Sequence, residues 1–85
     1  MNSIQLIEAY AHGIRDFSNM DLHGLYLSYE DLSGCDFSKS DLVNARLNYS
    51  ILNDCDFSLA EMKHANLCAA KIAKAKFTFF SEKWD

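Results

Sequence analysis

A large apolar side chain recurs at every fifth position from Phe17 to Phe77. Cut into fives from residue 15, the chain places such a residue third in thirteen consecutive units. They are Phe17, Leu22, Leu27, Leu32, Phe37, Leu42, Leu47, Leu52, Phe57, Met62, Leu67, Ile72 and Phe77. A helix repeats about every 3.6 residues and a flat strand about every 2, so neither keeps every fifth side chain on one face. We interpret the thirteen residues as the structural core of a repeat architecture.

A period of five fits a chain that turns by a quarter in each unit. Four units then close one coil of twenty residues, and successive coils pair through backbone hydrogen bonds about 4.8 Å apart. The first places of the units are small from residue 35 onward, which suits a second inward position. They are Cys35, Ser40, Ala45, Ser50, Cys55, Ala60, Ala65, Ala70 and Ala75. The pattern predicts an all-β solenoid whose repeats contact only their neighbours.

The repeat units carry a family resemblance. MDLHG, SDLVN, ANLCA and the CDFS units at residues 35 and 55 resemble the A(D/N)LXX pattern of the pentapeptide-repeat family. The resemblance covers about residues 15–79 and implies a right-handed quadrilateral β-helix, here of about three coils. The segment before RDFS is similar to short cyanobacterial members that begin with a helix.

Residues 3–13 predict a short α-helix, with Ser3 as its N-cap and Gly13 at its end. Its apolar stripe is read as Ile4, Ile7, Tyr10, Ala11 and Ile14. We interpret residues 1–14 as a capping segment over the open end of the first coil. The alternative is a helix that binds a partner or a membrane surface, and its low positive charge argues against the membrane.

The opposite end is expected to need a cap as well, because a solenoid leaves strand edges and an apolar disc there. The repeats are assigned to residues 15–79 and the terminal segment to 80–85. Phe79, Phe80 and Trp84 either fold over the disc or bury against a second copy in a homodimer. A third alternative is that the chain is an excerpt of a longer solenoid.

The first coil departs from the repeat at the small inward place, which is occupied by Met20, Leu25 and Glu30. Glu30 is the charged residue among them. An isolated buried carboxylate is costly. We expect either a distorted corner at Glu30 or a side chain that reaches solvent near the N-terminal cap.

Two columns of carboxylates are expected along the solenoid. Their members are Asp16, Asp36 and Asp56 in one column, and Asp21, Asp41 and Glu61 in the next. The family pattern prefers Asp or Asn at this place, so we interpret both columns as structural. Parallel outward carboxylates do not converge as a metal site requires. The alternative is mimicry of duplex DNA, since some pentapeptide-repeat proteins resemble duplex DNA and bind type II topoisomerases.

Other polar and aromatic residues suggest surfaces rather than chemistry. Tyr29 and Tyr49 share an outward column beside Tyr26 and form either a contact patch or a simple covering of the wall. Cys35 and Cys55 are predicted to stack as buried free thiols, and Cys68 points outward without an activating partner. His12, His23 and His64 have no metal-ligand spacing.

The composition supports a non-enzymatic role. A chain of 85 residues forms one domain, and its net charge of −4 argues against direct nucleic-acid binding. No signal segment and no apolar run of about 18 residues is seen, so a cytoplasmic protein without membrane contact is expected. No zinc pattern, phosphate-binding glycine loop or nucleophile–base constellation appears, so no cofactor, metal or catalytic residue is assigned. We predict a structural or protein–protein interaction module with an unknown protein partner; the alternative is a DNA-mimicking modulator of DNA gyrase.

Overall fold

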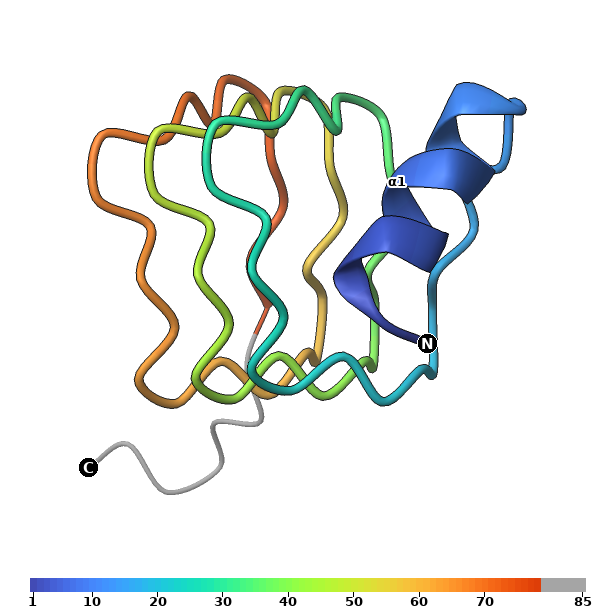
Figure 1. The fold of residues 1–85 in the computed structure, drawn as a ribbon. Coiled ribbons are helices and arrows are strands. Elements are labelled where there is room, and N and C mark those ends of the chain that lie inside the picture. Colours follow the sequence, from blue (N-terminus) through green and yellow to red (C-terminus); the bar gives the residue numbers. More distant parts are fainter. Residues whose placement is uncertain (79–85) are drawn as a thin grey trace, which may run out of the picture.

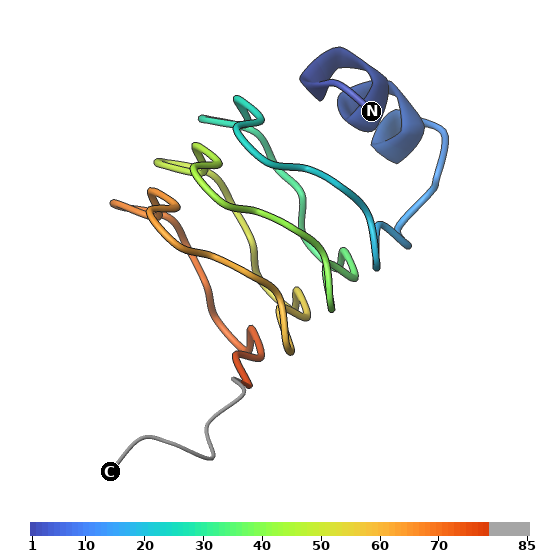
Figure 2. The ribbon, with the colours of Figure 1, turned by 90° about the horizontal axis from the view of Figure 1, so that it is seen from below.

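The computed structural model describes residues 1–78. The chain begins with helix α1 (Ser3–Ala11) and then winds into stacked coils (Figure 1). Figure 2 shows the coils as successive layers, with α1 lying beyond the first of them. Within residues 1–78, no helix has the length and apolar character needed to cross a bilayer. Phe79, Phe80 and Trp84, which the sequence suggests as a cap or association segment, lie outside the described residues.

Backbone pairing joins each coil to the next through single-residue parallel bridges, and residues 1–78 contain no longer strand. The bridges are Asp16–Asp36, Asp21–Asp41, Tyr26–Arg46, Asp31–Ile51, Asp36–Asp56, Asp41–Glu61, Arg46–Asn66, Ile51–Lys71 and Asp56–Lys76. Each joins second places of units twenty residues apart. Beside the first bridge, the Phe17 N–H donates to the Asp36 carbonyl at 2.8 Å, and the Asp36 N–H donates to the Arg15 carbonyl at 2.8 Å. The backbone therefore fixes which side chains lie above one another.

The chain turns its corners on residues in the left-handed backbone region. The fifth residue of each unit from Asn19 to Lys74 has a positive φ, between 56° and 78°, and glycine occupies this place only at Gly24 and Gly34. From Leu25 to Ala75 the next N–H closes the turn, as where Ala45 donates to the Leu42 carbonyl at 3.0 Å. A left-handed conformation is unfavourable for a residue with a Cβ atom. The ladder and the core must therefore hold these corners in place.

The third residues of the units point inward. Nine of them, from Phe17 to Phe57, are buried, whereas Met62, Leu67 and Phe77 are half-buried. Ile72, predicted as core, is instead 45% exposed. Within residues 1–78 no coil lies beyond its own, which accounts for this exposure. The four phenylalanines stack along one wall, with ring centroids 5.9, 5.4 and 5.0 Å apart in succession.

The first places form the second inward set. Leu25, Cys35, Ala45, Cys55 and Ala60 are buried there. Two serines share this environment without an unsatisfied hydroxyl, because Ser40 donates to the Phe37 carbonyl and Ser50 to the Leu47 carbonyl. A short polar residue is tolerated at this place because the corner itself supplies an acceptor.

Glu30 does not distort its corner. Its N–H donates to the Leu27 carbonyl at 3.4 Å, the bond that closes the other corners too, and its residue is only half-buried. Of the two expectations for Glu30, the partly exposed side chain is therefore the one that matches the structure.

Helix α1 begins one residue earlier than its predicted cap. Asn2 is the N-cap, and its side chain accepts the Gln5 N–H at 2.8 Å while the Gln5 side chain accepts the Asn2 N–H at 2.9 Å. This reciprocal pair is a capping box. The prediction of Ser3 as N-cap was wrong, because the Gln5 side chain favours the residue three places before it. The helix ends at Ala11 rather than at residue 13.

The predicted apolar stripe of α1 was also wrong in part. Ile4 and Ile14 are 68% and 49% exposed, and Ala11 is exposed too, whereas Leu6 is fully buried. The contacting face comprises Leu6, Ile7, Ala9 and Tyr10. Two overlapping stripes are available in this short helix, and contacts with the first coil select between them.

Three polar contacts orient α1 against the coils. The Tyr10 hydroxyl donates to the Ser33 carbonyl at 2.8 Å, and the Tyr26 N–H donates to the Ser3 hydroxyl at 2.9 Å. Arg15 donates to the Tyr10 carbonyl at 2.8 Å and places its guanidinium 3.5 Å from the centre of the Tyr10 ring. The helix is thus fixed to the end of the stack.

Candidate functional site

Two paired units of neighbouring coils carry exposed aromatic rings. Tyr26, Tyr29 and Tyr49 are 59%, 73% and 52% exposed. The rings of Tyr29 and Tyr49 stack with centroids 5.0 Å apart, and the Arg46 guanidinium lies 5.1 Å from the centre of the Tyr26 ring. We call Tyr26, Tyr29, Arg46 and Tyr49 the tyrosine wall. Arg46 is the member that the sequence did not single out, although it lies one coil beyond Tyr26.

The repeat geometry builds this wall. Second and fifth places point outward, and the Tyr26–Arg46 bridge aligns the two units that carry the wall. Within the same two units, the Ser28 hydroxyl donates to Asn48 Oδ1 at 2.6 Å, which ties the units together. Tyrosine and arginine are enriched where proteins bind each other, because they combine large apolar area with directional polar groups. The wall therefore has the composition of a protein-binding surface.

The carboxylates at second places support their own units. Asp16, Asp36 and Asp56 each accept the N–H of the residue two places on, at 2.9–3.0 Å. Asp41 accepts the Val43 N–H in the same way at 3.0 Å. These are Asx turns, in which a side chain stabilises the turn that follows it. In the column of Asp16, Asp36 and Asp56, the next place is Lys76, whose backbone forms a parallel bridge with Asp56. The run of negative charge therefore stops at the last coil.

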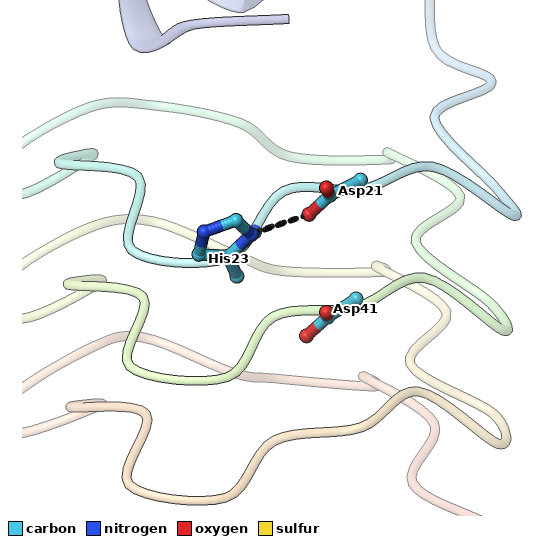
Figure 3. Close-up of side chains that lie close together, drawn as sticks. All are labelled: Asp21, His23 and Asp41. Atoms are coloured by element: carbon cyan, nitrogen blue, oxygen red, sulfur yellow. Dashed lines mark hydrogen bonds and ion pairs between the residues drawn. The ribbon is translucent and has the colours of Figure 1, made fainter.

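Three titratable side chains meet on the neighbouring column. Asp21, His23 and Asp41 each offer one ligand atom, and these atoms all lie within 4.8 Å of one another (Figure 3). His23 Nδ1 lies 2.6 Å from Asp21 Oδ1, and the side chains of His23 and Asp21 are 65% and 72% exposed. The histidines have no metal-ligand spacing in the sequence. The structure brings His23 to the carboxylates because the turn after Asp21 folds the fourth place back beside the second.

The pair formed by Asp21 and His23 alters the protonation of both groups. The hydrogen bond from the His23 ring lowers the pKa of the Asp21 carboxyl, and the His23 N–H adds to this. The same hydrogen bond, followed by the charge of Asp21, raises the pKa of His23 above its ordinary value of 6.5. The negative charge of Asp41 acts in the same direction on His23. The stacked carboxylates thus favour a cation beside them.

The buried thiol of Cys35 offers little reactivity. Cys35 and Cys55 are free and buried, and the Cys55 thiol lies 3.1 Å from the Leu32 carbonyl. A hydrogen bond to Cys55, together with burial, raises the pKa of the Cys35 thiol, so this group stays protonated. Cys68 is exposed. Nucleophilic chemistry needs a thiolate that substrate can reach, which Cys35 does not supply.

Comparison with known proteins agrees with the repeat pattern. The family model described as Pentapeptide repeats matches in eight copies over residues 16–58 and 40–78. A crystal structure of a pentapeptide repeat protein from Nostoc Pcc 7120 is similar to this chain, with a TM-score of 0.50 and 28% identity over 99% of this chain and 88% of that one. No curated protein matches. The resemblance seen in the sequence is confirmed, including its likeness to a cyanobacterial member, and the chain belongs to the pentapeptide-repeat family, whose repeats imply a right-handed β-helix.

Proposed function

We propose that this protein is a non-enzymatic module that binds another protein through the tyrosine wall. In this proposal it is a quadrilateral β-helix of about three coils, capped by α1. The observation that carries the proposal is the exposure of Tyr26, Tyr29 and Tyr49 at outward places of two paired units of the scaffold. Exposed aromatic clusters of this kind mark association sites in soluble proteins.

Rigidity supports the same proposal. Tyr29 and Tyr49 are already stacked, with ring planes 2° apart, so each ring restricts the other before a partner binds. Ordering flexible side chains opposes association, and a wall that is ordered beforehand avoids part of that cost. Arg46, packed near Tyr26, adds donors that can meet carbonyl or carboxylate groups of a partner.

The surroundings of the titratable groups favour binding over catalysis. The hollow beside Asp41 is lined by Lys39, Ser40, Asp41, Leu59 and Glu61. Its serine is buried and donates its hydroxyl to the Phe37 carbonyl, so that oxygen is not paired with a general base. Acyl transfer needs a nucleophile within hydrogen-bond reach of such a base. The hollow lacks that arrangement.

Modulation of DNA gyrase by duplex mimicry is the second candidate. The column of Asp21, Asp41 and Glu61 favours it, because these three residues follow one another through two bridges. The parallel column beginning at Asp16 ends in Lys76, which shortens the acidic track. A supercoiling assay with purified gyrase tests this candidate directly, and unchanged supercoiling at micromolar protein would remove it.

The principal proposal is tested by affinity capture from the cells that produce the protein. The tagged wild type is compared with Tyr29→Ser/Tyr49→Ser and with Asn44→Ser/His64→Ser, a control pair in which the residues also lie twenty apart at exposed fifth places. We expect a partner that the wild type and the control retain and the tyrosine variant loses. Equal retention by all three proteins contradicts the wall as the binding site, provided that circular dichroism shows unchanged folding.

A further inference from the structure

The cluster of Asp21, His23 and Asp41 is held together by the backbone of two coils. The Leu22 N–H donates to the Asp41 carbonyl at 2.8 Å, and the Asp41 N–H donates to the Met20 carbonyl at 2.9 Å. The two carboxylates therefore start from neighbouring, fixed points of the ladder. His23 follows Asp21 by two residues within the same unit and comes back against it across the turn, as Figure 3 shows.

Each carboxylate in this cluster retains coordinating capacity. Asp21 Oδ1 accepts from the N–H and the ring of His23, and Asp41 Oδ1 accepts the Val43 N–H. These bonds leave the second oxygen of each carboxylate without a hydrogen bond from residues 1–78. The cluster faces solvent, so an ion can reach it without opening the fold.

The column that begins at Asp16 shows what distinguishes this cluster. It has the same ladder and the same Asx turns, but serine follows each carboxylate at the fourth place, at Ser18, Ser38 and Ser58. A serine hydroxyl is a poor ligand for a transition metal, whereas imidazole is among the commonest. In its neutral form, the His23 ring supplies a nitrogen ligand, which the other acidic column lacks.

We infer that Asp21, His23 and Asp41 form a binding site for a divalent transition-metal ion, for which Zn²⁺ is the representative. The ion takes His23 Nδ1 and one oxygen from each carboxylate, and water fills its remaining positions. It replaces the hydrogen bond between His23 and Asp21, because a nitrogen that ligates a metal carries no proton. The mixed nitrogen and oxygen donor set favours Zn²⁺ over Mg²⁺, which prefers oxygen ligands alone.

Binding at this site would join the first coil to the second. Asp21 and His23 belong to one coil and Asp41 to the next, so the ion adds a cross-link between layers that the backbone already pairs. A ligand that binds only the folded chain raises the temperature of unfolding. Metal binding at this site can therefore be measured in two ways, as a rise in the unfolding temperature and as a binding affinity.

Titration of the full-length protein, freed of metal by chelation, tests the inference. Zn²⁺ binding is followed by calorimetry, and the shift of the His23 ring is followed by NMR. We expect one ion per chain and a higher unfolding temperature with Zn²⁺. His23→Ala and Asp41→Asn should each weaken binding by roughly tenfold or more, since even loss of an outer-shell partner costs about that much.

Two matched variants control the test. His64→Ala removes another exposed histidine, and Asp36→Asn removes a carboxylate of the column that has serine in place of histidine. Both should bind Zn²⁺ as the wild type does. Absence of binding, equal binding by His23→Ala, loss of binding in His64→Ala, or displacement of Zn²⁺ by equimolar Mg²⁺ would each overturn the inference. Circular dichroism of every variant separates loss of a ligand from loss of the fold.

Discussion

Tyr29 and Tyr49 lie twenty residues apart, yet their rings are nearly parallel, with planes 2° apart and centroids 5.0 Å apart. Both residues also have a positive φ, of 66° and 61°. The stack therefore joins two strained corners of neighbouring coils on the outside of the solenoid. Its contacts contribute to the pairing of those coils as well as to the tyrosine wall.

This relationship predicts a coupling energy between the two tyrosines. In urea unfolding, Tyr29→Ser and Tyr49→Ser should together lose less stability than the sum of the two single variants. The expected coupling is about 0.5–1 kcal/mol, the lower part of the range for aromatic pairs because these rings are exposed. The pair Asn44→Ser and His64→Ser, which has the same spacing without two rings, should show a smaller coupling. Strict additivity at the tyrosines would show that the stack adds no stability.

The corners predict an unusual sensitivity to branching at Cβ. Ala69 has a φ of 59° and is exposed, whereas Ala73 is also exposed but has no positive φ. A β-branched residue is strongly disfavoured in the left-handed region. Ala69→Val should therefore lower the free energy of unfolding by about 1–2 kcal/mol more than Ala73→Val. Thermal and urea unfolding measure the difference.

Asparagine provides the complementary substitution at this corner. It enters the left-handed region more readily than other residues with a Cβ atom. Ala69→Asn should leave the free energy of unfolding unchanged or raise it, whereas Ala69→Val should lower it. Similar losses for valine at positions 69 and 73 would contradict the role assigned to the corner.

The core was predictable from the sequence because the inward place admits one kind of side chain. Leu32 and Phe37 differ in shape, but both are large and apolar, and the period of five is visible without knowledge of the backbone. The corner conformation was not predictable in this way. Lys39 and Leu59 have a positive φ at a place where glycine or asparagine would have signalled it. Cooperative stacking of coils, rather than local preference, holds these residues there.

The metal-ligand cluster escaped prediction for a related reason. A spacing of two residues between Asp21 and His23 places them on one side only if the intervening chain folds as it does in this turn. In the sequence, the carboxylates follow the repeat period whereas the histidines do not, so the two sets show no relationship to each other. The approach of His23 Nδ1 to Asp21 depends on the Asx turn, whose signal is the aspartate at the second place.

The pair of Asp21 and His23 predicts a pH dependence whose sign follows from its two pKa shifts. The pKa of His23 is raised, so its stabilising effect is complete below the ordinary value of 6.5 and is lost as the pH rises through the higher folded value. The pKa of Asp21 is lowered, so its effect is complete above 3.8 and is lost as the pH falls through the lower folded value. The pair therefore contributes fully between pH 3.8 and pH 6.5.

An NMR titration of the His23 ring in metal-free protein checks this. The midpoint should lie above 6.5 in the wild type and should fall in Asp21→Asn, which removes the largest cause of the shift. Asp41→Asn should lower it less, because the charge of Asp41 is the weaker influence. An unchanged midpoint in Asp21→Asn would exclude the hydrogen bond as the cause.

Helix α1 supplies the last prediction, through two residues that lie two places apart. Leu6 is fully buried against the first coil, whereas Ile4 is 68% exposed. Leu6→Ala should lower the free energy of unfolding by about 2–5 kcal/mol, as removal of a buried leucine side chain generally does. Ile4→Ala should change it by no more than about 0.5 kcal/mol, the usual range for exposed positions. Both substitutions favour the helix intrinsically, so helix propensity does not explain a difference between them. Equal losses of unfolding free energy in urea would mean that α1 contacts the coils through the stripe containing Ile4. A loss confined to Leu6→Ala would show that packing on the first coil stabilises the whole stack.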